Sequence, residues 1–160
     1  MPRHPVLLRE FEPEFTGALI RIFEEQIAFN HLLGLRITSL TPERASGSLA
    51  MRRELVGHFA YNRVHGGVIS AVLDAMAGLA VMAALGARHM DEPVPQRLAR
   101  FARVGTIDLR VDYLRPGIGE RFEAHAEVMR IGSRVASARM EFRGADGTLL
   151  STGTAAYIVS

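Results

Sequence analysis

One aspartate stands alone in the most apolar stretch of the chain. The segment from Gly66 to Ala87, GGVISAVLDAMAGLAVMAALGA, carries a single charge, at Asp74. Burying a carboxylate among apolar side chains is costly unless the group is hydrogen-bonded or used in chemistry. Such a carboxylate can activate water as a general base or attack a carbonyl carbon as a nucleophile. A hydrogen-bonded structural aspartate is the plainer alternative, and the residue types leave all three interpretations open.

Two glycines mark the point where this apolar stretch begins. Gly66 and Gly67 follow His65, at the expected start of a helix. The first N–H groups of a helix lack intrahelical partners, and glycine allows a ligand to approach the backbone closely. These N–H groups would therefore suit the oxyanion that forms when a carbonyl group is attacked. A tight turn made only for packing is the alternative. We expect His65 to be a core histidine that fixes the turn, in preference to a proton-transfer role.

Composition restricts the chemistry further. The 160 residues include 19 basic residues, all arginine, and no cysteine. Without cysteine and lysine there can be no disulfide, thiolate metal site or Schiff base. The net charge of +2 argues against a general nucleic-acid surface. Most of the arginines are attributed to codon preference, and a few are candidates for binding a phosphorylated ligand.

The elements that must position these residues follow from periodicity. Apolar residues at helical spacing predict a helix over 11–33, which Gly34 ends. The Ala- and Gly-rich segment 66–87 predicts a second helix, which protein and not lipid must enclose, since it holds Asp74. A polar connection is expected over 88–103. Strands are expected at 35–40, 44–53, 106–114, 120–131, 133–143 and 148–159, with short turns that indicate an antiparallel meander.

Packing these elements together gives the predicted architecture. A helix that is apolar on every side needs cover, and a curved antiparallel sheet of five or six strands can wrap it. The fold class is therefore α+β, with a sheet rolled round a central helix. We expect an N-terminal helical extension over 1–33 and the main domain over 34–160.

The motif around the glycines resembles a known family. Val64-His65-Gly66-Gly67-Val68, with Asp74 nine residues after the histidine, is similar to the signature of hotdog-fold acyl-CoA thioesterases, in the branch of the phenylacetate-pathway enzyme. The run from Asp112 to Gly117, DYLRPG, extends the resemblance, which covers roughly residues 34–159. It implies hydrolysis of acyl-CoA to free acid and coenzyme A, with no cofactor.

Helix geometry predicts that a complete active site needs residues from two chains. Gly66 and Asp74 are eight residues apart, or about 12 Å along a helix axis. An oxyanion donor and a base must both reach one carbonyl carbon, so they cannot easily act from the same helix. In a homodimer with antiparallel central helices, Gly66 of one protomer faces Asp74 of the other. The resemblance implies the same composite site, twice per dimer, and is also compatible with a tetramer built as a dimer of dimers.

The resemblance also suggests further site residues. Thr106, ten residues before Pro116, matches a family position that helps to place water. The position of a common family asparagine is held by Phe59, which His58 and Asn62 flank, and a one-residue shift would bring His58 into that role. Candidates for contacting the substrate and the phosphates of coenzyme A are His58, Asn62, Arg63, Arg115, Arg130, Ser133 and Arg134.

Two other functions remain open. A non-catalytic acyl-CoA-binding hotdog protein is the main alternative, which Phe59 favours and Asp74 opposes. A hotdog hydratase is the second, although no matching His–carboxylate pair is found. The six histidines lack zinc-site spacing, so no metal is expected. Met1 to Glu10 lacks an apolar core of signal-peptide type, which predicts a cytoplasmic protein. Together with the charge at Asp74 and the low net charge, we expect no membrane or nucleic-acid partner.

Overall fold

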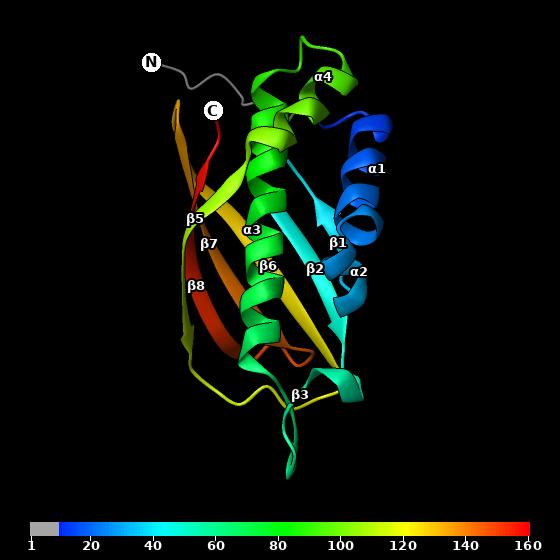
Figure 1. Ribbon diagram of the computed structural model, residues 1–160, viewed down its shortest axis with the longest axis vertical. Coiled ribbons are helices and arrows are strands. Elements are labelled where there is room, and N and C mark those ends of the chain that lie inside the picture. The colour runs from blue at the N-terminus through cyan, green and yellow to red at the C-terminus, as the bar shows by residue number, and fades with distance from the viewer. Residues whose placement is uncertain (1–9) are drawn as a thin grey trace, which may run out of the picture.

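The computed structural model describes residues 10–160 and contains one long helix lying across a curved sheet (Figure 1). The sheet has six antiparallel strands in the order β1-β2-β6-β7-β8-β5. The strands are β1 (Arg36–Leu40), β2 (Arg44–Ala50), β5 (Gly105–Tyr113), β6 (Arg121–Ile131), β7 (Val135–Gly144) and β8 (Leu149–Ile158). The predicted α+β class and hotdog architecture are confirmed.

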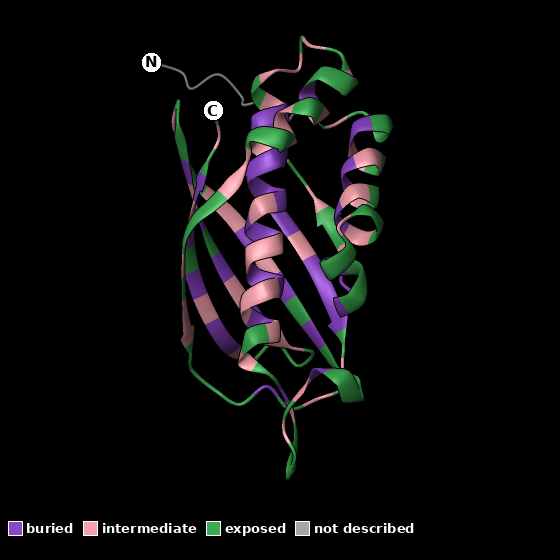
Figure 2. Ribbon diagram, viewed as in Figure 1, coloured by how far each residue is buried: buried purple, intermediate pink, exposed green. Residues whose placement is uncertain are grey.

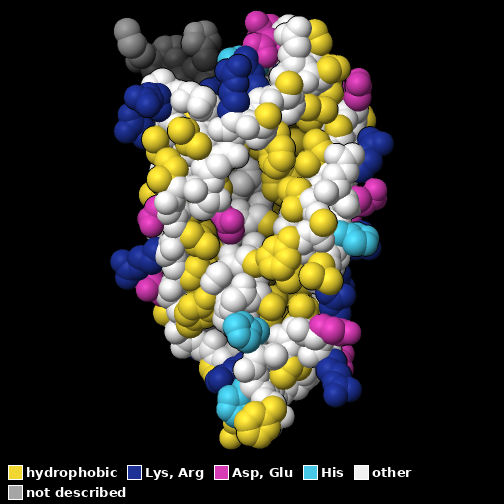
Figure 3. All heavy atoms as spheres, in the orientation of Figure 1, with side chains coloured by type: hydrophobic (Ala, Val, Ile, Leu, Met, Phe, Trp, Pro, Cys, Tyr) yellow, Lys and Arg dark blue, Asp and Glu magenta, His cyan; other side chains and the backbone are white. Residues whose placement is uncertain are grey.

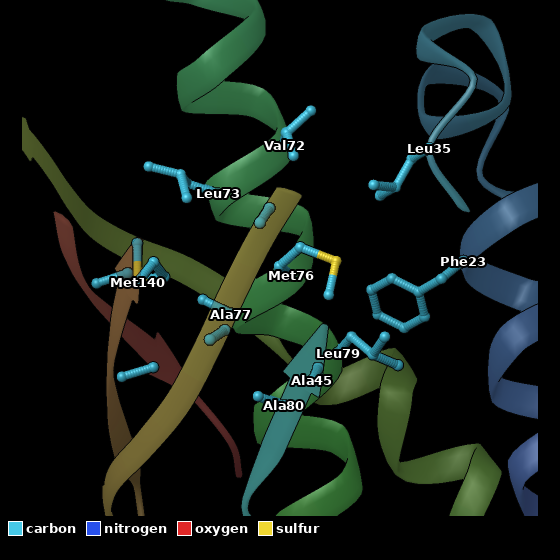
Figure 4. Packing of buried hydrophobic residues seen from close by; sticks show 14 of the residues in the cluster. Phe23, Leu35, Ala45, Val72, Leu73, Met76, Ala77, Leu79, Ala80 and Met140 are labelled. Atoms are coloured by element: carbon cyan, nitrogen blue, oxygen red, sulfur yellow. The ribbon is translucent and has the colours of Figure 1, made fainter. Parts of the chain in front are cut away.

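Helix α3 (Gly66–Arg88) is the central helix, and it is the one helix among the described residues that is long and apolar enough to cross a membrane. It lies against the concave face of the sheet and is purple on much of its surface (Figure 2). Fully buried side chains such as Leu73, Met76 and Leu79 occur along its length. Figure 4 shows Met76 and Leu79 packed toward Phe23 from the N-terminal segment. The prediction that protein encloses this helix is therefore confirmed.

The N-terminal segment is helical but broken, so the predicted single helix over 11–33 is wrong. Helix α1 (Pro13–Arg21) runs into a π-helical turn (Ile22–Gln26), and α2 (Ala28–Leu33) follows an extended residue, Ile27. Long-range contacts are made next to the break. Glu24 Oε1 accepts a hydrogen bond from the backbone N–H of Ile37 at 2.6 Å, and its Oε2 binds Arg36 Nη1 at 2.9 Å. These contacts tie the N-terminal segment to strand β1.

Two further elements differ from the sequence prediction. The expected polar connection over 88–103 contains helix α4 (Val94–Ala99) and a 3₁₀ turn (Arg100–Arg103). A small hairpin of β3 (Val56–His58) and β4 (Tyr61–Val64) precedes α3 and was not predicted, because its strands are too short to show a period. This hairpin projects from the end of the molecule where α3 begins (Figure 1).

The strand order corrects the expected simple meander. Strands β6, β7 and β8 follow one another, but β5 pairs with β8 and forms the edge of the sheet. The connection over 114–120 therefore passes β8 and β7 to reach β6. Among residues 10–160, β5 has no pairing partner on its outer side, and Ile107 and Tyr113 on this strand are exposed.

Candidate active site

Asp74 lies near the middle of α3 and is held by two hydroxyl groups. Its Oδ1 accepts a hydrogen bond from Thr106 Oγ1 at 2.9 Å and another from the Tyr157 hydroxyl at 2.8 Å. The Tyr157 oxygen also lies 2.9 Å from the Asp74 carbonyl oxygen. Among the described residues, no donor contacts Oδ2. The two bonds fix the carboxylate through one oxygen and leave the other available for chemistry.

Tyr157 was not predicted as a site residue. It lies on β8, 83 positions from Asp74, and only 2% of its surface is exposed. Burial, reinforced by the negative charge of Asp74, raises the pKa of the Tyr157 phenol far above its ordinary value. The group therefore stays protonated and donates its hydrogen. A period-two pattern places Tyr157 on the inner face of β8 with Ala155, and a polar tip on such a face was the available signal.

The start of α3 is capped by a side chain. His65 is the N-cap residue, in an extended conformation, and its Nδ1 accepts the Gly67 N–H at 2.8 Å. His65 is exposed, so the prediction of a core histidine is wrong, although its ring does fix the turn. Because the cap uses the Gly67 N–H, the Gly66 N–H is the one that has no acceptor among the described residues.

The first turn of α3 is also braced by β5. The Tyr113 hydroxyl donates to the Gly66 carbonyl oxygen at 2.8 Å, and Ser70 Oγ donates to the same oxygen at 3.1 Å. The Tyr113 and Ser70 hydroxyls also contact each other. These contacts tie the glycine pair to the sheet edge, and neither Tyr113 nor Ser70 was singled out from the sequence.

Asp74 faces an open cavity of about 480 Å³. Asp74, Thr106 and Tyr157 form a polar cluster in its lining, Asn30 and Ser70 add two further polar side chains, and the remainder is mainly apolar. The apolar lining comes from α3, the N-terminal segment, the 3₁₀ turn and β5: Phe23, Ile27, Phe29, Ala71, Ala75, Gly78, Phe101, Val104 and Leu109. Figure 3 shows hydrophobic side chains gathered over α3 and the N-terminal helices on this face. The volume lies in the range of small-molecule sites.

Two of the predicted substrate contacts lie beside the glycines. Arg63 and Arg115 line a second depression of about 390 Å³, together with Gly66 and Tyr113. Arg115 is exposed and donates to the Leu149 carbonyl oxygen at 2.9 Å. The structure therefore places two permanent positive charges next to the start of α3.

The other predicted contacts are more scattered. His58 and Asn62 lie on the β3–β4 hairpin, where the His58 ring stacks on Phe59, whose surface is 99% exposed. Arg130, Ser133 and Arg134 lie around the β6–β7 turn, at the opposite end of α3, where Arg88 Nη2 donates to the Ile131 carbonyl. Within one protomer these three do not join Arg63 and Arg115, since 23 helical residues span about 33 Å.

Comparison with known proteins agrees with this geometry. The thioesterase superfamily matches residues 61–151. A medium/long-chain acyl-CoA thioesterase of Escherichia coli, YigI, is 38% identical over 138 residues, covering 86% of this chain and 89% of its own. Its Salmonella typhimurium counterpart is 40% identical over 140 residues, with the same coverage.

A solved structure extends the likeness to the whole fold. A Shewanella oneidensis protein related to the thioesterase superfamily superposes with a TM-score of 0.86 at 36% identity, covering 94% of this chain and 100% of its own. The likeness in sequence and in fold thus extends over most of the chain. The chain belongs to the thioesterase superfamily.

Proposed function

We propose that the protein hydrolyses acyl-CoA thioesters to the free acid and coenzyme A. The observation that carries this proposal is the Asp74 carboxylate, fixed by Tyr157 and Thr106 in the wall of a mainly apolar cavity. An apolar chain fits the lining, and the named Escherichia coli relative is a medium/long-chain enzyme. We therefore assign medium or long acyl groups as the substrate class.

Asp74 is the residue that carries the reaction in this proposal. As a base, its Oδ2 takes a proton from water, the hydroxide adds to the thioester carbon, and coenzyme A leaves as the thiol. As a nucleophile, Oδ2 itself displaces coenzyme A and forms an anhydride, which water then hydrolyses. Both routes release one acid and one thiol, and the hydroxyls on Oδ1 support either by fixing the carboxylate.

The oxyanion donor is the Gly66 N–H at the positive end of α3. It lies eight residues from Asp74, about 12 Å along the same helix, so it serves the Asp74 of a second protomer. Two features support a homodimer with antiparallel central helices. The outer edge of β5 is unpaired within residues 10–160, and exposed Ile107 and Tyr113 lie on it. Pairing of edge strands would cover both.

Coenzyme A binds from the side of the glycine pair. Arg63 and Arg115 supply the positive charge that its phosphates need, and Arg suits phosphate geometry. His58 and Asn62 of the projecting hairpin are further contacts. Contacts from Arg130, Ser133 and Arg134 require another protomer, because they lie at the far end of α3. No cofactor takes part, and the protein acts in the cytoplasm. The described part of the N-terminal extension, residues 10–33, contributes Phe23, Ile27 and Phe29 to the acyl cavity. The homodimer is also compatible with a tetramer built as a dimer of dimers.

Replacement of Asp74 tests the reaction. Asp74→Asn keeps the shape of the side chain and removes the charge, so coenzyme A release should fall about 10²- to 10⁴-fold. Asp91→Asn, an exposed aspartate after α3, is the matched control and should keep full turnover. A folded Asp74→Asn protein with wild-type turnover would refute the assignment. Tight acyl-CoA binding by wild-type protein without turnover would favour a non-catalytic binder, the alternative that Phe59 suggests.

A further inference from the structure

The acyl cavity follows one face of α3. Ser70, Asp74 and Gly78 all line it and are spaced four residues apart, so they lie one above another on the helix. Gly78 is therefore one turn beyond the carboxylate, about 6 Å toward the C-terminal end of α3. An acyl chain that leaves the carbonyl carbon at Asp74 in this direction passes directly over Gly78.

Aromatic rings surround the cavity at the level of Gly78. Phe23 of the N-terminal segment and Phe101 of the 3₁₀ turn both line the cavity, and their rings meet edge to face with centroids 5.5 Å apart. Tyr157 borders it from the sheet. A side chain at position 78 would point toward these aromatic rings.

Packing does not explain why a glycine stands at position 78. A methyl group placed there would meet Tyr157 Cε1 at 3.8 Å and Phe23 Cε1 at 3.9 Å, both ordinary contacts. Gly86, on the same helix, is different, because its methyl group would come within 2.2 Å of Phe15 Cζ. Glycine inside a helix is destabilising relative to alanine. Gly86 has a steric reason to be glycine, whereas a methyl group at Gly78 would fit without a clash.

We propose that Gly78 is a specificity-determining residue that keeps the acyl cavity open beyond Asp74 and so sets the longest acyl chain the enzyme accepts. This inference rests on the proposed thioesterase function and adds a substrate limit to it. A larger side chain at position 78 points into the cavity between Phe23 and Tyr157 and blocks the path of a long chain. Short chains end before this point and remain substrates.

The test compares coenzyme A release from butanoyl-CoA and hexadecanoyl-CoA by wild type, Gly78→Ala and Gly78→Leu. Each methylene that loses its place should lower kcat/KM about fourfold, so displacing two gives about a 16-fold loss. For Gly78→Leu, we expect a fall of at least that size for hexadecanoyl-CoA and less than twofold for butanoyl-CoA. Gly78→Ala should move the ratio of the two substrates in the same direction by a smaller amount.

Gly17 provides the matched control, because it lies on α1 with no described atom within 4 Å of an added methyl group. Gly17→Ala and Gly17→Leu should leave the substrate ratio unchanged. An unchanged ratio in folded Gly78→Leu, or an equal loss for both substrates, would overturn the inference. If Gly78→Leu does not fold, an unchanged ratio in Gly78→Ala overturns it. A wild-type protein that cleaves neither substrate would instead overturn the proposed function itself.

Discussion

Removing the Tyr157 hydroxyl tests whether the carboxylate of Asp74 must be held in place. Tyr157→Phe keeps the buried ring and deletes only the donor that lies 2.8 Å from Asp74 Oδ1. A hydrogen bond to a charged group contributes about 1.5–3 kcal/mol. If that whole contribution is lost in the transition state, kcat falls about 10- to 150-fold. If the hydroxyl acts by positioning Asp74, as proposed, KM should change little.

The assay is coenzyme A release under steady-state conditions, with folding checked by circular dichroism and thermal unfolding. Tyr61→Phe is the control, since Tyr61 is an exposed tyrosine of the projecting hairpin. It should match wild type. A folded Tyr157→Phe protein with unchanged kcat would refute the argument that this hydrogen bond prepares the carboxylate. A rise in KM with constant kcat would refute it as well, because it would make Tyr157 a substrate contact.

Three further predictions concern stability and pH. His65→Ala removes the cap acceptor of the Gly67 N–H and should cost about 1 kcal/mol of unfolding free energy in urea titrations, together with a loss of turnover. Gly34→Ala should cost about 1–2 kcal/mol, because Gly34 has φ 74°, whereas Gly17→Ala, within α1, should not destabilise. The raised pKa of Tyr157 predicts that the folded protein keeps a proton that the unfolded chain releases above about pH 10. The unfolding free energy should therefore fall above that pH, by up to about 1.4 kcal/mol per pH unit. This decline should be absent from Tyr157→Phe.

The periodicity of the sequence was sufficient to predict the elements that carry the site. Alternation over 106–114 and the three later segments matches β5 to β8 closely, because alternate residues of β6, β7 and β8 are buried and those of β5 are partly buried. Asp74 and the glycines at the helix start could also be identified from the sequence, because a lone charge and a glycine pair interrupt the apolar pattern. The choice of Thr106 as a residue that helps to place water came from the family resemblance, and its hydrogen bond to Asp74 became visible only in the structure.

Long-range contacts account for what the sequence did not show. Tyr157 meets Asp74 across 83 positions, and no local pattern links them. The break in the N-terminal helix lies beside the Glu24 contact with the backbone of β1, which is equally non-local. The position of β5 at the sheet edge depends on which strand it pairs with, and the turns alone did not decide this. The sequence could not show which glycine N–H is free to bind the oxyanion. Only the His65 contact in the structure shows that the Gly67 N–H is occupied.

The central claim is that two protomers share each active site, and subunit complementation tests it most directly. Gly66→Pro removes the oxyanion N–H at the first helical position, where proline is tolerated, and His65 already has a compatible extended backbone. Gly66→Pro and Asp74→Asn should each be inactive alone. Co-expressed, half of the dimers are mixed and each has one intact site of two, so activity should return to about a quarter of wild type. A mixed preparation that stays inactive, although mixed dimers are isolated from it, would contradict the shared site.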